Sequence, residues 1–251
     1  MRIMKEHIRC VHITSHDVDT KQELKISSLL AMCQESSEQQ LAEFGLDHAE
    51  LKKRDLAFLL ARVFIQYHRI PVEGEDVTIS VCPRGAQGAQ YFREFHISKG
   101  DELLVEVMES WILVELSTRK IRPPSIMEDL EIDIESHRGK WMGRLSRLKM
   151  PKEMPLLSQR KIHYSDLDFN GHVSNIHYGR FLLDALPSYA NFDPDPEKKM
   201  EPPRSYQKIW INYIGETKWG DTLQIYGKED ADGFSLYAEN AHGRSIECQG
   251  K

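Results

Sequence analysis

The chain has 251 residues, of which 40% are hydrophobic and 29% are charged, and its formal net charge is −6. This composition is typical of a soluble globular protein, and the acidic balance gives nucleic acid no overall electrostatic attraction, so we expect no nucleic-acid partner. Charged residues interrupt the long apolar runs, as in Asp55–Ile65, and no membrane span is predicted. No signal-peptide pattern and no C-x-x-C pair is found, which favours a cytoplasmic protein without disulfides or a zinc site.

The first half predicts one long helix followed by strands. Residues 1–13 alternate like a strand, and an amphipathic helix is expected at about Gln22–Phe44. Long strands follow, including Gln90–Ser98 and Glu102–Leu116. A run of strands after a single helix favours an α+β fold with an antiparallel sheet, and the sheet must curl around the helix to be covered by it.

A basic segment separates the two halves. Residues 136–160 are rich in Lys, Arg, Met and Pro, and we expect them to link an N-terminal unit, 1–135, to a C-terminal unit, 161–251. The charges belong either to a solvated linker or to a docking surface for an acidic partner. The basic residues of this region are Arg138, Lys140, Arg144, Arg147, Lys149, Lys152, Arg160 and Lys161.

The second half predicts a similar order of elements. A polar loop leads into a helix at about Val173–Leu186, and a Pro-rich, charged stretch, Asn191–Ser205, follows as a surface loop. Asp230–Gly233 is expected to be the turn of a hairpin. Strands are expected near Tyr206–Tyr213, Asp221–Gly227, Phe234–Asn240 and Arg244–Cys248.

The two halves resemble each other in sequence. His16–Ser36 aligns with Ser165–Ala185, and Ile65–Ile79 aligns with Ile211–Ile225 in the same order. In this alignment Lys21 and Glu23 stand where the second half has Asn170 and His172. The sequence therefore predicts one active unit and one unit that serves binding or architecture.

The stretch Asp166–Val173, D-L-D-F-N-G-H-V, begins like a calcium-binding loop. Such a loop closes with a Glu at its twelfth position, where this chain has His177. His163, His172, His177 and Asp166 match no common metal-ligand spacing either, so we expect no metal and no cofactor. Three structural alternatives stay open: Asp168 or Asn170 caps the helix, His172 is a structural hydrogen-bonding group, and Glu216 is a solvated surface charge.

Ser165–Tyr178 resembles the D-x-D-x-N-x-H-V-x-N-x-x-Y signature of acyl-acyl carrier protein (acyl-ACP) thioesterases. Glu109–Pro124 resembles a Trp-led strand of their first domain, which ends in a Thr-Arg pair and prolines. Gly215–Asp221 stands where the family places a catalytic Glu, and Thr217 stands where its members often carry a cysteine. The resemblance implies a tandem (double) hotdog, in which two curled antiparallel sheets each wrap a central helix.

The resemblance also implies the catalytic residues, with Asp168, Asn170 and His172 on the loop and Glu216 on a neighbouring strand. Thioester hydrolysis needs an activated water, a donor to the carbonyl oxygen and a proton for the leaving thiolate. Glu216 is the candidate base, and His172 would share its proton or polarise the water, so which of the two is the base stays open. Asp168 would set the tautomer of His172 or the geometry of the loop. The amide of Asn170 would position water or substrate, and N–H groups at the start of the helix would face the oxyanion.

The expected reaction is hydrolysis of the acyl-ACP thioester to free fatty acid and carrier protein, which ends chain elongation. The expected partner is acyl carrier protein with its phosphopantetheine-linked acyl chain. Two alternatives remain: an acyl-CoA thioesterase and a non-catalytic acyl-binding hotdog protein. The two units would form a pseudo-dimer within one chain, with a homodimer also possible. The acyl chain would lie in or beside the first unit, and the candidate lining residues, for which plain core is an equal alternative, are Leu29, Met32, Cys33, Phe58 and Leu60.

Overall fold

A computed structural model describes residues 2–134, 145 and 147–251 of the chain. Over these residues, an antiparallel sheet of eleven strands runs in the order β2-β4-β5-β6-β3-β10-β13-β12-β11-β9, with β7 beside β6. A separate parallel pair joins β1 (Arg2–Ile3) to β8 (Ile132–Asp133). The strands of the large sheet are β2 (His7–His12), β3 (Leu56–Tyr67), β4 (Asp76–Gln87), β5 (Gln90–Lys99), β6 (Glu102–Glu115), β7 (Ile121–Arg122), β9 (Leu156–Lys161), β10 (Lys208–Tyr213), β11 (Thr222–Asp230), β12 (Gly233–Asn240) and β13 (Gly243–Gly250).

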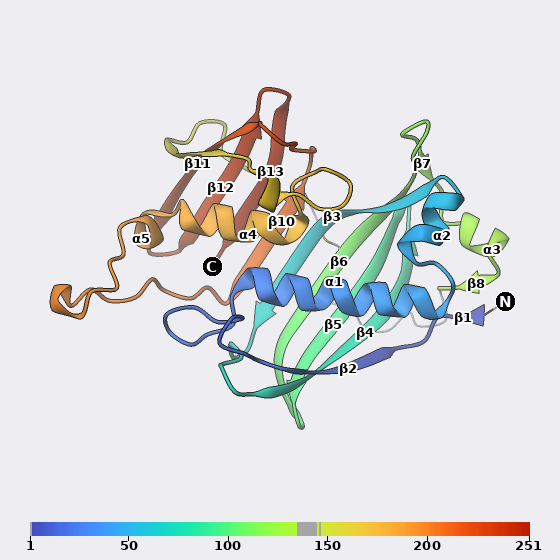
Figure 1. Cartoon of the computed structure of the whole chain (residues 1–251), viewed down its shortest axis with the longest axis horizontal. Helices are drawn as coiled ribbons and strands as arrows, with labels where there is room; N and C mark the ends of the chain where they lie inside the picture. Colours follow the sequence, from blue (N-terminus) through green and yellow to red (C-terminus); the bar gives the residue numbers. More distant parts are fainter. Residues whose placement is uncertain (1, 135–144, 146) are drawn as a thin grey trace.

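Two helices lie on the same side of this sheet. Helix α1 (Ile26–Glu43) crosses the strands of the first half, and α4 (Asn175–Asp184) crosses those of the second (Figure 1). The two helices contact each other, and a Cβ added at Gly179 of α4 would lie 3.2 Å from Cγ2 of Ile26 on α1. The shorter helices are α2 (His48–Lys53), α3 (Ile126–Asp129), α5 (Pro187–Ala190) and the 3₁₀ turns η1 (Tyr164–Asp166) and η2 (Pro196–Lys198).

Both long helices begin later than the hydrophobic pattern predicts. Leu24 donates its backbone N–H to Pro71 O at 2.8 Å, and Val173 donates to Thr217 O at 2.8 Å. These residues pair across the chain in extended conformation, so the helical conformation begins only at Ile26 and Asn175. The strands predicted in both halves are confirmed, whereas α2 and α3 are too short to show a periodic signal.

The two halves share one sheet. Strand β3 of the first half pairs with β10 of the second, in a register that sets Val63 beside Ile211 and Ile65 beside Ile209. The strands expected as two sheets are therefore joined at this edge-to-edge contact. The fold is a mixed α/β arrangement with a large antiparallel sheet and few helices.

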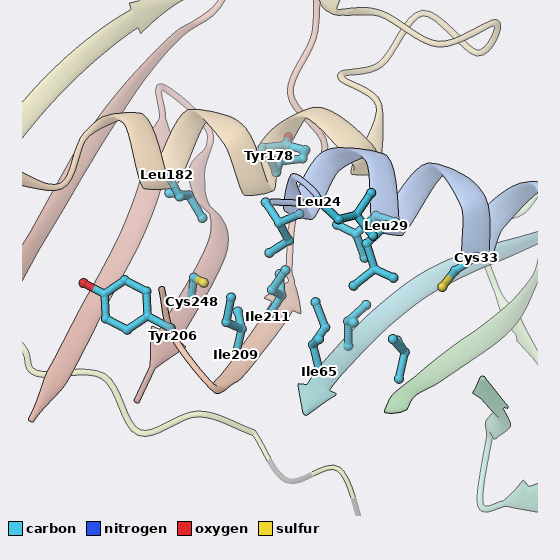
Figure 2. Close-up of a cluster of buried hydrophobic side chains, with 14 of the residues drawn as sticks. Leu24, Leu29, Cys33, Ile65, Tyr178, Leu182, Tyr206, Ile209, Ile211 and Cys248 are labelled. Carbon is cyan, nitrogen blue, oxygen red and sulfur yellow. The ribbon is translucent and has the colours of Figure 1, made fainter. Parts of the chain in front are cut away.

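The main hydrophobic core lies between the helices and the sheet. Figure 2 shows Leu29 and Cys33 of α1 and Leu182 of α4 pointing toward Ile65 and Ile211 of the central strands. All five side chains are buried. Because side chains of both halves meet in this cluster, the burial of apolar area holds the halves together as well as folding each one.

The predicted linker is only partly a linker. Strand β9 begins at Leu156, inside the range 136–160, and pairs with β11. Leu145 is buried against Phe64 and Phe92, beside Met108. Three of the basic residues predicted there, Arg138, Lys140 and Arg144, lie outside the described residues.

One basic residue of this segment, Arg160, forms contacts within the second half. Arg160 donates to Asp166 Oδ1 at 2.9 Å, and its guanidinium lies 3.8 Å from the ring centroid of Phe181. An ion pair and a cation–π contact therefore hold the Arg160 guanidinium in place, and its part in a docking surface stays a prediction. Among the described residues, no helix is both long enough and apolar enough to cross a bilayer.

Candidate active site at the junction of the two halves

The loop that carries the polar cluster is braced by Asp168. Its Oδ1 accepts the backbone N–H of Asn170 at 2.8 Å and that of His172 at 3.3 Å, and its own N–H donates to His172 O at 2.8 Å. Gly171, with φ +77°, supplies the left-handed turn in between. Asp168 thus sets the geometry of the loop, one of the two roles expected for it.

Neither Asp168 nor Asn170 caps the following helix. The N-cap of α4 is Ser174, which makes no side-chain cap hydrogen bond. The Asp168 carboxylate is engaged with the loop backbone, which leaves the capping interpretation wrong. Asn170 is exposed and its side chain lines the cavity described below.

The first half folds into the same loop. Asp19 Oδ1 accepts the N–H groups of Lys21 at 2.8 Å and Glu23 at 3.1 Å, and Asp19 N–H donates to Glu23 O at 2.9 Å. Gln22, with φ +61°, takes the left-handed position that Gly171 holds in the second loop. The brace is therefore common to both halves, and the side chains of Asn170 and His172 are what distinguish the second loop.

Glu216 meets the loop from the connection between β10 and β11, not from a strand as predicted. Its Oε2 lies 3.3 Å from His172 Nε2, and its Oε1 accepts a hydrogen bond from Arg119 Nη1 at 2.8 Å. A longer contact of 3.8 Å reaches Lys218 Nζ. Glu216 is exposed, as the surface-charge interpretation expects, but its carboxylate is paired with three partners and is not simply solvated.

Thr217, next to Glu216, anchors this connection. It is fully buried, and its hydroxyl donates to Ser245 Oγ at 3.0 Å. Asn240 Nδ2 donates to Glu216 O at 3.2 Å, which ties the same segment to β12. Thr217 holds the carboxylate in place, and its hydroxyl is engaged away from the cavity.

The cysteines offer no nucleophile at this site. Burial raises the pKa of the Cys33 and Cys248 thiols well above the ordinary value, which disfavours the thiolate. Among the described residues that line the cavity at this site, none is a cysteine. A nucleophilic cysteine is also missing from position 217, where the chain has a threonine.

The calcium interpretation also fails at its first ligand. Asp166 is buried, and its carboxylate is taken by Arg160 and by the backbone N–H of His163 at 3.0 Å. Among the described residues, the grouping with metal-ligand geometry is Glu94, His96 and Glu106 on β5 and β6, away from the loop.

A cavity of about 790 Å³ joins the polar cluster to the interior of the first half. Its mouth is lined by the four predicted residues, Asp168, Asn170, His172 and Glu216, together with Arg119. Its far end is formed largely by apolar side chains of a second hydrophobic cluster. The side chains of this end include Met4, Leu46, Leu51, Phe58, Tyr91, Trp111, Met127 and Ile134.

Of the residues predicted to line an acyl tunnel, Phe58 does so. Leu29, Met32 and Cys33 belong to the main core instead, and Leu60 packs against it. The reason is their position on α1: the cavity follows the last turns of the helix, from Gln34 to Ala42. Their prediction as tunnel residues is wrong.

Sequence reasoning missed Arg119, Phe169 and Trp111 as parts of the site. Arg119 belongs to the Thr-Arg pair of the first half, and pairing with Glu216 needs a contact between distant segments that no local pattern shows. Phe169 is 69% exposed at the mouth, with its ring 4.1 Å from that of His48. The signal in the sequence for Phe169 was a single aromatic residue within an otherwise polar loop.

A second cavity, of about 490 Å³, lies beside the loop of the first half. There Lys21 Nζ lies 2.7 Å from Glu23 Oε2, which also accepts a hydrogen bond from Ser205 at 2.6 Å. The polar groups at this loop are paired with one another, so the copy has no counterpart of the His172–Glu216 arrangement.

The family model for the acyl-ACP thioesterase N-terminal domain matches residues 5–132, and that for the C-terminal domain matches residues 150–247. Relatives include the chloroplastic acyl-[acyl-carrier-protein] hydrolase FATB2 of Cuphea viscosissima, 26% identical over 192 residues that cover 70% of this chain. The chloroplastic palmitoyl-acyl carrier protein thioesterase of Cuphea hookeriana is also 26% identical, over 70% of this chain. The chain spans only 46% and 45% of these two proteins.

Solved structures share the fold along nearly the whole chain. An acyl-ACP thioesterase from Bacteroides thetaiotaomicron superposes with a TM-score of 0.81 at 18% identity, covering 98% of this chain and 96% of that one. A 12:0-ACP thioesterase from Umbellularia californica gives a TM-score of 0.75 at 16% identity, with 98% and 96% covered.

Proposed function

Because the chain belongs to the acyl-ACP thioesterase family, we propose that it hydrolyses the thioester of a fatty acyl-acyl carrier protein and so ends elongation of the acyl chain. One observation carries the proposal. His172 and Glu216 meet at the mouth of a cavity whose far end is largely apolar, so a thioester at the mouth would have its acyl chain inside.

We assign the base to Glu216, which accepts a proton from the attacking water while His172 shares that proton. The carbon–oxygen bond forms, the carbon–sulfur bond breaks, and the proton passes through His172 to the departing thiolate. Asn170 positions the water or the substrate, and Asp168 holds the loop on which both side chains stand. The N–H groups at the start of α4, where Ser174 and Asn175 line the cavity, face the developing oxyanion.

In architecture we propose a tandem hotdog with unequal units. The first unit, residues 1–135, holds the acyl chain, and the second, residues 161–251, supplies the catalytic loop and Glu216. The matching loops at Asp19 and Asp168 support a pseudo-dimer within one chain. A cytoplasmic location and a possible homodimer stay predictions.

We propose that acyl carrier protein covers the mouth of the cavity. Support comes from an exposed aromatic side chain in the lining of the cavity, Phe169, which is 69% exposed. The cations Arg119 and Lys218 both contact Glu216, and both suit an acidic partner or its phosphopantetheine phosphate.

The test is fatty acid release from carrier protein loaded with chains of several lengths, with matched acyl-CoA substrates, for the wild type and Glu216→Ala. Release that depends on the carrier and collapses in the variant supports the proposal. Equal rates on acyl-CoA would make the protein a general acyl thioesterase. Binding of acyl chains without any release would make it a non-catalytic acyl-binding protein.

A further inference from the structure

Two buried residues with hydroxyl groups belong to the lining of the large cavity. Tyr91 is 7% exposed and Ser37 is 3% exposed, and both line the cavity. Within the described part of the chain, neither Tyr91 Oη nor Ser37 Oγ has a hydrogen-bond partner. Leaving a buried hydroxyl without a hydrogen-bond partner costs about 1–3 kcal/mol. The lining at Tyr91 and Ser37 therefore favours a ligand with a hydrogen-bonding group.

The same lining contains a guanidinium that contacts the backbone of Ser37. Arg93 follows Tyr91 by two residues on β5, so both side chains lie on the same face of the sheet, and Arg93 also lines the cavity. Its Nη1 donates to Ser37 O at 3.5 Å, a long contact that places the guanidinium next to Ser37. Desolvation by burial lowers the pKa of Arg93 to about 10.

The strand beside β5 supports this arrangement. Glu109 on β6 is the register partner of Arg93 and is 2% exposed. Its Oε2 accepts the indole N–H of Trp111 at 2.9 Å. Arg93 therefore lies in the sheet beside a strand that carries a buried carboxyl group and also lines the cavity, which makes it part of a built polar site and not a chance surface charge.

A plain hydrocarbon chain gives these groups nothing to bind. It would bury Tyr91 Oη and Ser37 Oγ without partners and would leave the guanidinium of Arg93 against methylene groups. An oxygen atom on the chain would accept from Arg93 and pair with the two hydroxyls, while the apolar far end at Leu51 and Met127 would take the rest of the chain.

We propose that the acyl substrate carries an oxygen substituent, a hydroxyl or an oxo group, which Tyr91, Ser37 and Arg93 bind inside the cavity. This inference rests on the proposed thioester hydrolysis, because it names the substrate class of that same site. The three residues determine specificity and take no part in bond breaking.

The test compares carrier-linked chains of one length: a saturated chain, a set with a hydroxyl at successive positions from carbon 3 outward, and the corresponding oxo chains. For at least one position we expect kcat/KM about tenfold above that of the saturated chain, the effect of about one hydrogen bond. Tyr91→Phe should reduce this ratio severalfold. Tyr226→Phe, the same change on β11 outside the lining of this cavity, should keep it.

The outcomes separate the inference from the proposed function. Saturated chains hydrolysed as fast as every oxygenated chain would overturn the inference and leave the hydrolase standing. No hydrolysis of any thioester would overturn the proposed function. The inference is then decided by calorimetric binding of saturated and oxygenated free fatty acids to the wild type and Tyr91→Phe. Tighter binding of an oxygenated acid that Tyr91→Phe abolishes upholds it, and equal binding overturns it.

Discussion

At the scale of single residues, the site depends on a carboxylate that both halves of the chain hold. Glu216 belongs to the second half, and Arg119, which donates to it, belongs to the first. Arg119 has φ +59°, and its N–H donates to Glu115 O at 2.9 Å, so the turn after β6 sets its direction. An exposed ion pair contributes little to stability. The main effect of the Arg119–Glu216 contact is therefore to position the Glu216 carboxylate.

Replacing Arg119 should therefore impair turnover more than folding. We expect Arg119→Gln to lower kcat about tenfold, or about 1.4 kcal/mol of activation free energy, with a change in Tm of about 2 °C or less. Steady-state kinetics on a carrier-linked substrate measures this. The control is Arg122→Gln, which removes a contact of 3.3 Å to Glu115 on the same hairpin. Equal losses in both variants would contradict a positioning role for Arg119.

The brace residues of the two loops form a matched pair. Asp168→Ala and Asp19→Ala each remove two hydrogen bonds to backbone N–H groups, so we expect similar losses of stability, about 1–2 kcal/mol. Only Asp168→Ala should lower kcat, by about tenfold to a hundredfold, because it alone releases His172. Urea unfolding and kinetics on both variants test this. A similar fall in kcat for Asp19→Ala would show that the loops do not differ in function.

At the scale of elements, the sequence predicts the helices and strands better than the space between them. The apolar stripe of α1 correctly indicates that Leu29 and Cys33 lie inside, because the helical period records which face is buried. The stripe does not show whether a buried residue packs in the core or lines a cavity. The cavity is lined by residues of α1, α2, β3, β5 and the loop of the second half, which lie far apart in the sequence.

Chain-length preference should follow the far end of the cavity. Leu51→Ala enlarges that end, so we expect the preferred acyl chain to lengthen by about two carbons. Leu29→Ala makes the same change in the main core, and it should cost about 2–5 kcal/mol of stability without moving the preference. Competition between carrier-linked chains of different length is the measurement. An unchanged preference in Leu51→Ala would exclude this end as the chain-binding region.

The turn before β4 predicts an acid-sensitive contribution to stability. The Arg69 guanidinium lowers the pKa of Glu75 to about 2, and Val72 N–H and Lys99 add hydrogen bonds. Since the pKa is lower in the folded state, Glu75 stabilises the fold above its ordinary value of 4.5. This contribution is lost as the pH falls through about 2.

Glu75→Gln should then lower the free energy of unfolding at pH 7 by about 3 kcal/mol, with a smaller difference from the wild type at low pH. Denaturant titrations between pH 3 and pH 7 check this. The exposed neighbour Glu73→Gln serves as the control and should unfold like the wild type. A difference at pH 7 that persists unchanged at pH 3 would contradict the assigned cause.

At the scale of the whole molecule, the two halves carry loops of the same backbone geometry with different side chains. The repeat in the sequence predicted this division, since Lys21 and Glu23 replace Asn170 and His172 at matching places. The four residues named from the sequence lie together at one mouth. The pairing of β3 with β10, and the cavity that runs from one half into the other, escaped prediction because they depend on contacts between distant segments.

The account rests on hydrolysis by the second loop alone, and a matched pair of variants tests it most directly. The measurement is the rate of fatty acid release from acyl carrier protein by the wild type, His172→Ala and Glu23→Ala, with folding checked by circular dichroism. We predict that His172→Ala loses about a hundredfold or more in kcat, as expected for a residue that shares the catalytic proton, while Glu23→Ala stays within about twofold of the wild type. Wild-type turnover in His172→Ala, or equal losses in both variants, would contradict the account.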